Sequence, residues 1–273
     1  MKMPSGALTG CAALILIDCC FGARAVAKAK FIEFDPPGSI ATQISSRSLN
    51  ETGDVTGYYI KKDGHQRAFI RTNNGDFVDI ATSLSDPQPA AINIHDVTTG
   101  QDRPHKGFIA AIDGSVITFR VPGTDDSGYG TKPRVIDDHG NVAGHYTNPS
   151  EFNWHGFLRS MDGNFIKFDA PNAGTQRDQG TYVTDLNSTG YIAGTVVDAN
   201  NVGHGFLRAP DGTMIIVDVS NAGTGPGQGT WLGGLNENGA VAGYFYSAKG
   251  RAHGFLRDID GNIVPITVHQ AGN

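Results

Sequence analysis

The chain is built around a repeated five-residue phrase, His-Gly-Phe-Leu-Arg. The phrase occurs at 155–159, 204–208 and 253–257, at intervals of 49 residues. Weaker copies begin at Lys106 and Arg67. Self-similarity at a fixed period is typical of folds in which one small unit stacks on its neighbours. The five copies therefore predict a repeat architecture that fills nearly the whole chain of 273 residues.

Turn signals divide each repeat into four strands. In the most regular repeat we expect strands at 181–186, 191–197, 204–208 and 213–218. The first turn, 187–190, has Asn first and Gly fourth, and glycine adopts positive φ without a Cβ clash. The second, Asp211-Gly212, is a strong hairpin signal between apolar runs. Two hairpins per repeat predict a four-stranded antiparallel sheet.

The third strand carries two adjacent large apolar residues, Phe206 and Leu207. Neighbours along a strand point to opposite faces, so both faces of each sheet must be covered. Gly205 lets an adjacent sheet approach closely. Four-stranded sheets stacked face to face in a ring are the blades of a propeller. We therefore expect an all-β fold, a five-bladed β-propeller built from four-stranded antiparallel repeats of about 49 residues.

Two parts of the chain depart from the regular plan. Residues 31–35 alternate like residues 165–169, so we expect an N-terminal strand that completes the last blade, beside or in place of 263–268. The second repeat is short, because its first three strands must fit between Ile80 and Ile109, and its turn glycine is displaced to Gly100. We expect that blade to be distorted.

The first 27 residues resemble a secretory signal peptide. Lys2 gives a basic start, 7–17 is mostly apolar, and Ala25–Ala27 is a small-residue cleavage site. We expect cleavage after Ala27, which leaves 28–273 as a single propeller domain in a secreted or periplasmic protein. The apolar run is too short to span a bilayer.

The three cysteines agree with this processing. Cys11, Cys19 and Cys20 all lie in the segment to be removed, so the mature chain would contain no disulfide. Residues 8–11, Leu-Thr-Gly-Cys, leave lipidation of Cys11 as an alternative. A net charge of −6 argues against nucleic-acid binding, which needs a basic face. We expect a monomer without a membrane span.

The repeated pattern also resembles a known family. Leu-Asn-x-x-Gly-x-Val-x-Gly-x-Tyr is followed by His-Gly-Phe-Leu-Arg, Asp-Gly and Phe-Asp-x-Pro, over about residues 31–268. This order resembles the bacterial HAF-type extracellular repeat family. The resemblance implies export and a propeller-like fold. It implies no catalytic residues.

The sequence offers little chemistry. His155, His204 and His253 share one repeat position, and equivalent positions in a ring cannot converge on one metal unless they line its axis. We expect these histidines to bond a neighbouring strand or turn. No nucleotide fingerprint, nucleophile elbow or metalloprotease motif occurs. We therefore predict no catalytic residue, no metal site and no cofactor.

Binding is the better supported function. The connections 121–130, 170–180 and 219–229 are long and emerge on one face of the expected ring, and loops on a rigid scaffold commonly bind ligands. Tyr182 and Trp231 follow two of these loops and either stack on sugar rings or pack in the core. The candidate polar binding residues are Arg177, Asp178, Asp125 and Asp126. We expect an exported, non-catalytic protein for extracellular glycan or protein. Because the distance between paired carboxylates is spatial, a polysaccharide hydrolase or lyase remains the alternative.

Overall fold

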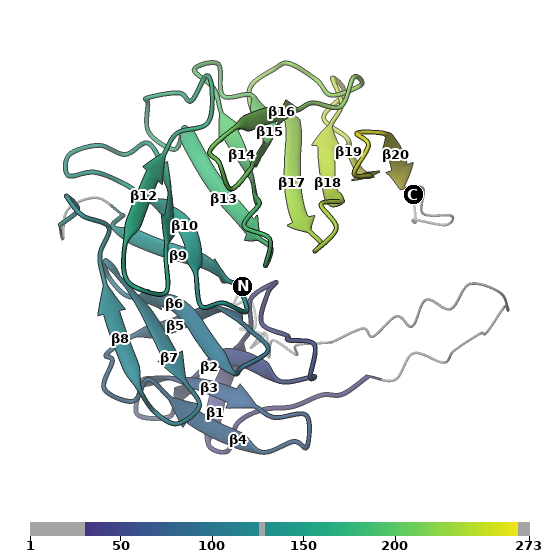
Figure 1. The fold of residues 1–273 in the computed structure, drawn as a ribbon. Helices are drawn as coiled ribbons and strands as arrows, with labels where there is room; N and C mark the ends of the chain where they lie inside the picture. Colours follow the sequence, from purple (N-terminus) through teal and green to yellow (C-terminus); the bar gives the residue numbers. More distant parts are fainter. Residues whose placement is uncertain (1–30, 126–128, 267–273) are drawn as a thin grey trace, which may run out of the picture.

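The computed structural model describes residues 31–125 and 129–266, and these contain strands, turns and loops. No helix in this part of the chain is long and apolar enough to cross a membrane. Twenty strands are present in the described residues (Figure 1). They are β1 (Ser39–Gln43), β2 (Val55–Lys61), β3 (Gln66–Arg71), β4 (Phe77–Ile80), β5 (Pro87–Ile92), β6 (Val97–Asp102), β7 (Lys106–Ala111), β8 (Val116–Phe119), β9 (Thr131–Ile136), β10 (Val142–Tyr146), β11 (His155–Arg159), β12 (Phe165–Phe168), β13 (Gly180–Leu186), β14 (Ile192–Val197), β15 (Gly203–Arg208), β16 (Met214–Val217), β17 (Gly229–Leu235), β18 (Val241–Tyr246), β19 (Ala252–Arg257) and β20 (Ile263–Ile266).

Each run of four strands forms an antiparallel sheet in chain order. The sheets are β1–β4, β5–β8, β9–β12, β13–β16 and β17–β20, and one parallel bridge between Gly203 and Gly229 joins the last two. The first strands β5, β9, β13 and β17 each carry a bulge where they pair with the second strand. The expected all-β repeats of four antiparallel strands are confirmed.

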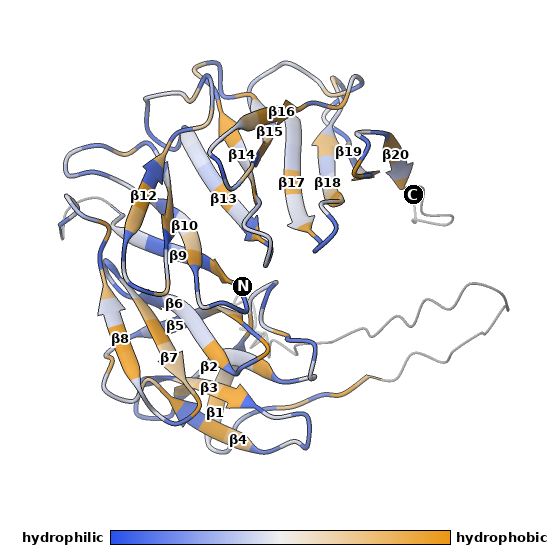
Figure 2. Cartoon of the chain, viewed as in Figure 1, coloured by the Kyte–Doolittle hydropathy of each residue, from blue (hydrophilic) through white to orange (hydrophobic). Residues whose placement is uncertain are grey.

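The sheets succeed one another along an arc. In Figure 1 the chain runs from β1–β4 at the bottom, through β5–β12 on the left, to β13–β20 across the top. Figure 2 shows hydrophobic stretches in the strands of every sheet. Four buried apolar clusters lie between consecutive sheets, so each sheet uses both faces except at the ends of the arc.

The phenylalanine of each third strand is fully buried. The five residues are Phe69, Phe108, Phe157, Phe206 and Phe255. Two of these rings contact a phenylalanine of the preceding sheet. The ring centroid of Phe206 lies 6.4 Å from that of Phe168 in β12, and the centroid of Phe157 lies 6.3 Å from that of Phe119 in β8. A glycine in the second strand makes room for the ring, since a Cβ on Gly243 would lie 2.7 Å from Phe255. The expected burial of Phe206 between sheets is confirmed.

The second sheet is not distorted, contrary to expectation. Its first turn follows the same plan, with Asn93 at the start and Asp96 at φ +56° where other repeats have glycine. Gly100 is therefore not a turn residue. It lies in β6 opposite Pro89 and matches the strand glycine of the other sheets. The repeat is short mainly because the connection from β4 to β5 has six residues, where the later connections between sheets have eleven, and also because the loop from β6 to β7 has only three.

Residues 31–36 form no strand, so the expected N-terminal strand is absent. Phe34 instead packs against the first sheet, with its ring 6.2 Å from Phe77 and 5.0 Å from the Arg71 guanidinium carbon. The same arginine–phenylalanine contact joins later sheets, where Arg208 lies 5.1 Å from Phe168 of the preceding sheet. Phe34 thus supplies to the first sheet the contact that a preceding sheet supplies elsewhere.

The outer face of the last sheet is exposed. Leu256 is 51% exposed and Val264 59%, whereas Leu207, at the same repeat position as Leu256, is 7% exposed beneath the last sheet. No sheet in the described part of the chain covers this face. The matched pair separates the energy of inter-sheet packing from the intrinsic preference of the residue.

We predict that Phe206→Ala lowers the free energy of unfolding by about 3–5 kcal/mol, because it leaves a cavity in a packed core. Leu207→Ala should cost about 2–4 kcal/mol, whereas Leu256→Ala should cost about 1 kcal/mol or less, because half of the Leu256 side chain is already exposed. Chemical denaturation of the three variants checks this. An unchanged unfolding midpoint for Phe206→Ala would contradict the packing described here.

We also predict that Gly205→Val destabilises the fold far more than Gly254→Val. A Cβ on Gly205 would lie 2.8 Å from the Val217 carbonyl oxygen and 2.9 Å from Leu232 of the next sheet. A Cβ on Gly254 would lie 3.3 Å from Ile266 and meet no following sheet. Thermal melts should show a large fall in Tm for the first variant and a small one for the second. Equal falls would show that sheet approach is not the cause.

Candidate functional site

The strand register aligns one residue of every first strand. Tyr182 pairs with Thr195 and Trp231 with Tyr244, each directly after the glycine of the second strand. The corresponding residues in the first three sheets are Gln43, Gln88 and Lys132. The expectation that Tyr182 and Trp231 occupy equivalent positions agrees with this register.

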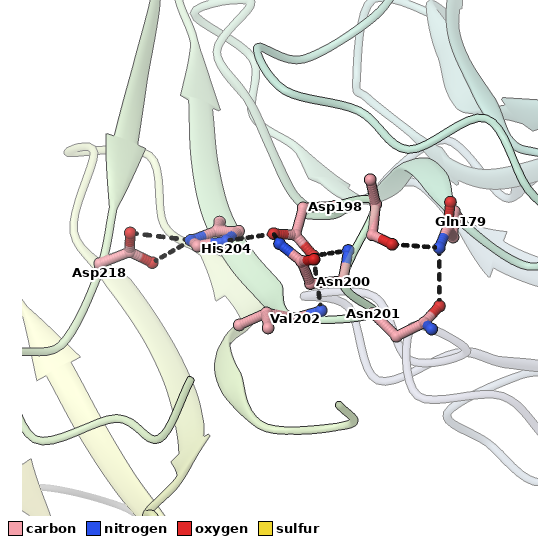
Figure 3. Close-up of polar contacts among 8 residues, drawn as sticks. Gln179, Asp198, Asn200, Asn201, Val202, His204 and Asp218 are labelled. Atoms are coloured by element: carbon pink, nitrogen blue, oxygen red, sulfur yellow. Dashed lines mark hydrogen bonds and ion pairs between the residues drawn. The ribbon is translucent and has the colours of Figure 1, made fainter. Parts of the chain in front are cut away.

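The long connections that precede these strands are clamped. The backbone N–H of Ala170 donates to Thr181 Oγ1 over 2.9 Å, and Val219 N–H donates to Thr230 Oγ1 over 3.0 Å. Gln179 is 2% exposed and donates from Nε2 to Ala199 O and to Asn201 Oδ1 at 2.9 Å (Figure 3). The loop from 170 to 180 is therefore fixed to the adjoining hairpin, and side chains on it are held in place.

Five ring side chains gather between the third and fourth sheets, and we call them the aromatic cluster. They are Tyr129, His145, Phe152, Trp154 and Tyr182. Trp154 stacks on Tyr129 at 5.1 Å between centroids, and His145 meets Trp154 edge-on at 4.8 Å. Trp154 is 5% exposed, whereas Phe152 is 36% exposed. The accessible surface of the cluster is thus formed by Phe152 and by the half-buried Tyr129 and Tyr182.

Two cations lie over the faces of these rings. Lys132 Nζ is 4.5 Å from the Trp154 centroid, and the Arg177 guanidinium carbon is 3.9 Å from the Phe152 centroid. Arg177 Nη1 also donates to Tyr129 Oη over 3.0 Å. Such cation–π contacts contribute about 0.5–1 kcal/mol each at exposed sites. They make the cluster both apolar and positively charged.

The structure brings only some of the predicted site residues together. Arg177, Asp178 and Tyr182 belong to one group, since Tyr182 Oη donates to the Asp178 carbonyl oxygen over 2.6 Å. Trp231 forms a separate parallel pair with Tyr244, at 6.4 Å between centroids. Asp125 lies in the loop after β8, where its carbonyl oxygen accepts from Arg120. Asp126 lies outside the described residues.

A pocket of about 210 Å³ adjoins the aromatic cluster, and we call it the cationic pocket. Its polar lining residues are Gln43, Ser45, Tyr58, Gln88, Gln101, Lys132 and Arg134. Partial burial, followed by repulsion from Arg134, lowers the pKa of Lys132. Desolvation by the surrounding strands, although Arg134 as a whole is exposed, and then repulsion from Arg47 lower the pKa of Arg134. Burial and these two cations hold the pKa of His145 well below its usual value, so this histidine is neutral.

A second cavity of about 390 Å³ is lined by the ends of the first strands β5, β9, β13 and β17 and by residues 46–51 that precede β2, and its lining is acidic. Four of its five carboxylates, those of Asp137, Asp138, Asp185 and Glu237, accept hydrogen bonds or form an ion pair. Asp185 pairs with Arg47 at 2.6 Å, and Asp137 Oδ1 accepts from the backbone N–H groups of His139 and Asn141. Glu237 accepts from Ser188 N–H over 3.0 Å. These contacts fix turns and join sheets.

Two of the three repeated histidines bond a neighbouring strand end, as expected. His155 Nδ1 lies 2.8 Å from Asp169 Oδ1, and His204 Nδ1 lies 2.9 Å from Asp218 Oδ2 (Figure 3). Each pair joins the third strand to the end of the fourth. His253 stacks on Phe245 at 5.0 Å. Within the described residues no group of three or more His, Cys, Asp or Glu side chains is placed to hold a metal ion.

The His155–Asp169 pair predicts a pH-dependent stability. The hydrogen bond to Asp169 raises the pKa of His155, against the opposing effect of burial. A raised pKa in the folded state means that the stabilisation is complete below the usual histidine pKa and is lost as pH rises through the folded value. Asp169→Asn should therefore lower Tm more at about pH 5.5 than at about pH 8.5. In a His155→Gln background this pH dependence should vanish, and its persistence would assign the effect to another group.

No protein-family model and no curated protein sequence matches the chain. Solved structures do resemble it. Porphyromonas gingivalis dipeptidyl peptidase 4 aligns at 9% identity and TM-score 0.48, over 89% of this chain and 40% of that chain. Puromycin hydrolase aligns at 14% identity and TM-score 0.52, over 88% of this chain and 42% of that chain. The chain thus spans about two fifths of each structure. The second likeness supports a propeller-like arrangement of repeated four-stranded sheets.

Five residues of the site are absent from the sequence prediction: Lys132, Arg134, Tyr129, Phe152 and Trp154. The signal for the first two lies in the register. Lys132 precedes its equivalent Tyr182 by 50 residues, whereas the third strands of the same sheets are 49 apart. A comparison at the fixed period of 49 therefore misses the equivalence by one residue.

Proposed function

We propose that this chain is a non-catalytic binding protein for an extracellular glycan, exported by its first 27 residues to the periplasm or the medium. The observation that carries the proposal is the aromatic cluster. Sugar rings present apolar faces, and aromatic side chains offer large contact surfaces with few torsions to freeze. Phe152 and Tyr129 provide such a surface, and Arg177 adds donors at its edge.

We further propose that the five sheets are the blades of one propeller of the HAF-repeat type. Two contacts support this. Phe34 occupies the place of a preceding strand at the first sheet. Arg47 joins the first sheet to the fourth and fifth, by donating to the carbonyl oxygens of Thr184 and Gly233 at 2.7 and 2.6 Å.

Polysaccharide cleavage is the competing function. It needs a carboxylic acid and a second carboxylate that are free to act on a substrate. In the central acidic cavity Asp137 and Asp185 are instead held by backbone N–H groups and by Arg47. This engagement favours binding over catalysis.

We predict that Phe152→Ala weakens glycan binding by about fivefold, because it removes about 1 kcal/mol of apolar contact. A glycan array, with a reducing-end assay on the same polysaccharides, identifies the ligand and measures turnover. Phe31→Ala is the control, since Phe31 is 64% exposed and remote in sequence from the cluster. Binding without turnover supports the proposal. Release of reducing ends, or no glycan bound at all, would contradict it.

A further inference from the structure

Lys132 and Arg134 are cations with little negative charge around them, since Asp178 only partly opposes the lowering of the Lys132 pKa and no carboxylate among the described residues opposes that of Arg134. Both belong to β9 and line the cationic pocket. Among the described residues neither side chain donates a hydrogen bond or forms an ion pair, and Lys132 Nζ lies over the rings of Tyr129 and Trp154. Arg47, from the corresponding stretch of the first sheet, differs in this respect, because it binds Asp185 and two carbonyl oxygens. The fold thus supplies hydrogen-bond and ion-pair partners for Arg47 and none among the described residues for Arg134.

The surroundings of these two cations favour an anion. Partial burial and repulsion from Arg134 lower the pKa of Lys132, and desolvation and repulsion from Arg47 lower that of Arg134. A bound negative group would favour the charged form of both side chains. The neighbouring His145 ring is neutral, so it neither adds to the positive charge of the pocket nor offsets it. Positive charge concentrated here is also exceptional in a chain of net charge −6.

The size and donors of the pocket indicate what kind of anion fits. Sites for whole small molecules measure about 300–1,000 Å³, and 210 Å³ is smaller. The pocket therefore suits one charged group of a larger ligand. A guanidinium matches the two oxygens of a carboxylate or sulfate, and an ammonium adds a point charge. Gln43 accepts from the Tyr58 hydroxyl with its carbonyl oxygen, which leaves its amide N–H groups as further donors.

Lys132 connects the pocket to the aromatic cluster. Its Nζ lies 5.1 Å from the Tyr129 centroid while the side chain also lines the pocket. A ligand that places an anionic group in the pocket therefore has an aromatic surface beside it. Free inorganic anions do not need that surface, whereas a charged sugar in a polymer uses both.

We propose that the cationic pocket binds the carboxylate or sulfate group of an acidic glycan between Lys132 and Arg134, with an adjoining sugar against Tyr129 and Phe152. This inference rests on the proposed glycan-binding function and narrows it to anionic polymers. Lys132 and Arg134 are specificity-determining residues in this assignment.

Matched ligands test the proposal. Polygalacturonate and its fully methyl-esterified form share one sugar backbone and differ in charge, and dextran sulfate and dextran provide the same comparison for sulfate. Titration calorimetry with the full-length protein should show at least tenfold tighter binding of one charged polymer than of its neutral partner. The tighter of the two charged polymers tells carboxylate from sulfate. Binding of the charged polymer should weaken with added salt, since the contact is an ion pair.

Two variants borrow residues from equivalent positions in this chain and should therefore fold. Lys132→Gln introduces the residue of the first and second sheets, and Arg134→Thr that of the fourth, as Gln43, Gln88 and Thr184 show. Each should weaken binding of the charged polymer by about tenfold to a hundredfold, the value of one charge-assisted hydrogen bond. Lys62→Gln is the control, an exposed cation at the turn between β2 and β3.

The outcomes separate the two proposals. If charged and neutral forms bind equally, the acidic-group inference is wrong and glycan binding stands. If no polymer binds, both proposals fail. If charged polymer binds but neither Lys132→Gln nor Arg134→Thr weakens it while both keep the wild-type Tm, the anion lies elsewhere and the pocket assignment is overturned. Should a variant fail to fold, the comparison of esterified and free polymer still decides whether the charge is recognised.

Discussion

The fold depends on one contact, a phenylalanine ring pressed between two sheets. Each third strand buries its phenylalanine completely, and a glycine in the neighbouring second strand leaves the room for the ring. Because the ring also packs against the preceding sheet, no sheet is complete alone. The first sheet has no predecessor, and Phe34 takes that part. At the N-terminal end of the arc, the segment that contains Phe34 thus covers part of the first sheet without forming a strand.

A different kind of force acts at the centre of the arc. Arg47 reaches from the first sheet to Asp185 of the fourth, and Leu235 N–H of the fifth sheet donates to the same carboxylate over 2.6 Å. Burial raises the pKa of Asp185, and the Arg47 charge and the backbone donors oppose this effect. Buried ion pairs add little net stability but penalise arrangements that leave one partner alone. The contact therefore specifies which sheets meet, while apolar packing supplies the free energy.

The sequence predicts the sheets correctly because each turn and each strand is determined by a few neighbouring residues. The hairpin turns, the four strands per repeat and the burial of Phe206 follow from turn chemistry and from alternation along a strand. Gly100 was misread because Asp96 adopts the positive φ that elsewhere requires glycine, so the turn had no glycine to mark it. The N-terminal segment was misread because alternation predicts a strand but cannot show whether a pairing edge is free.

The candidate site was harder to predict because it lies at a position where the residue differs from sheet to sheet. A packing position must meet the same demand in every sheet, and the third strand accordingly repeats one residue five times. The position that holds Lys132 meets no such demand. It carries glutamine in two sheets, lysine in one and large aromatic residues in two. Because different residues at this position leave the sheets intact, packing does not determine which residue stands there, and ligand binding can. In a chain of this kind, departure from the repeat indicates binding more directly than the repeat itself does.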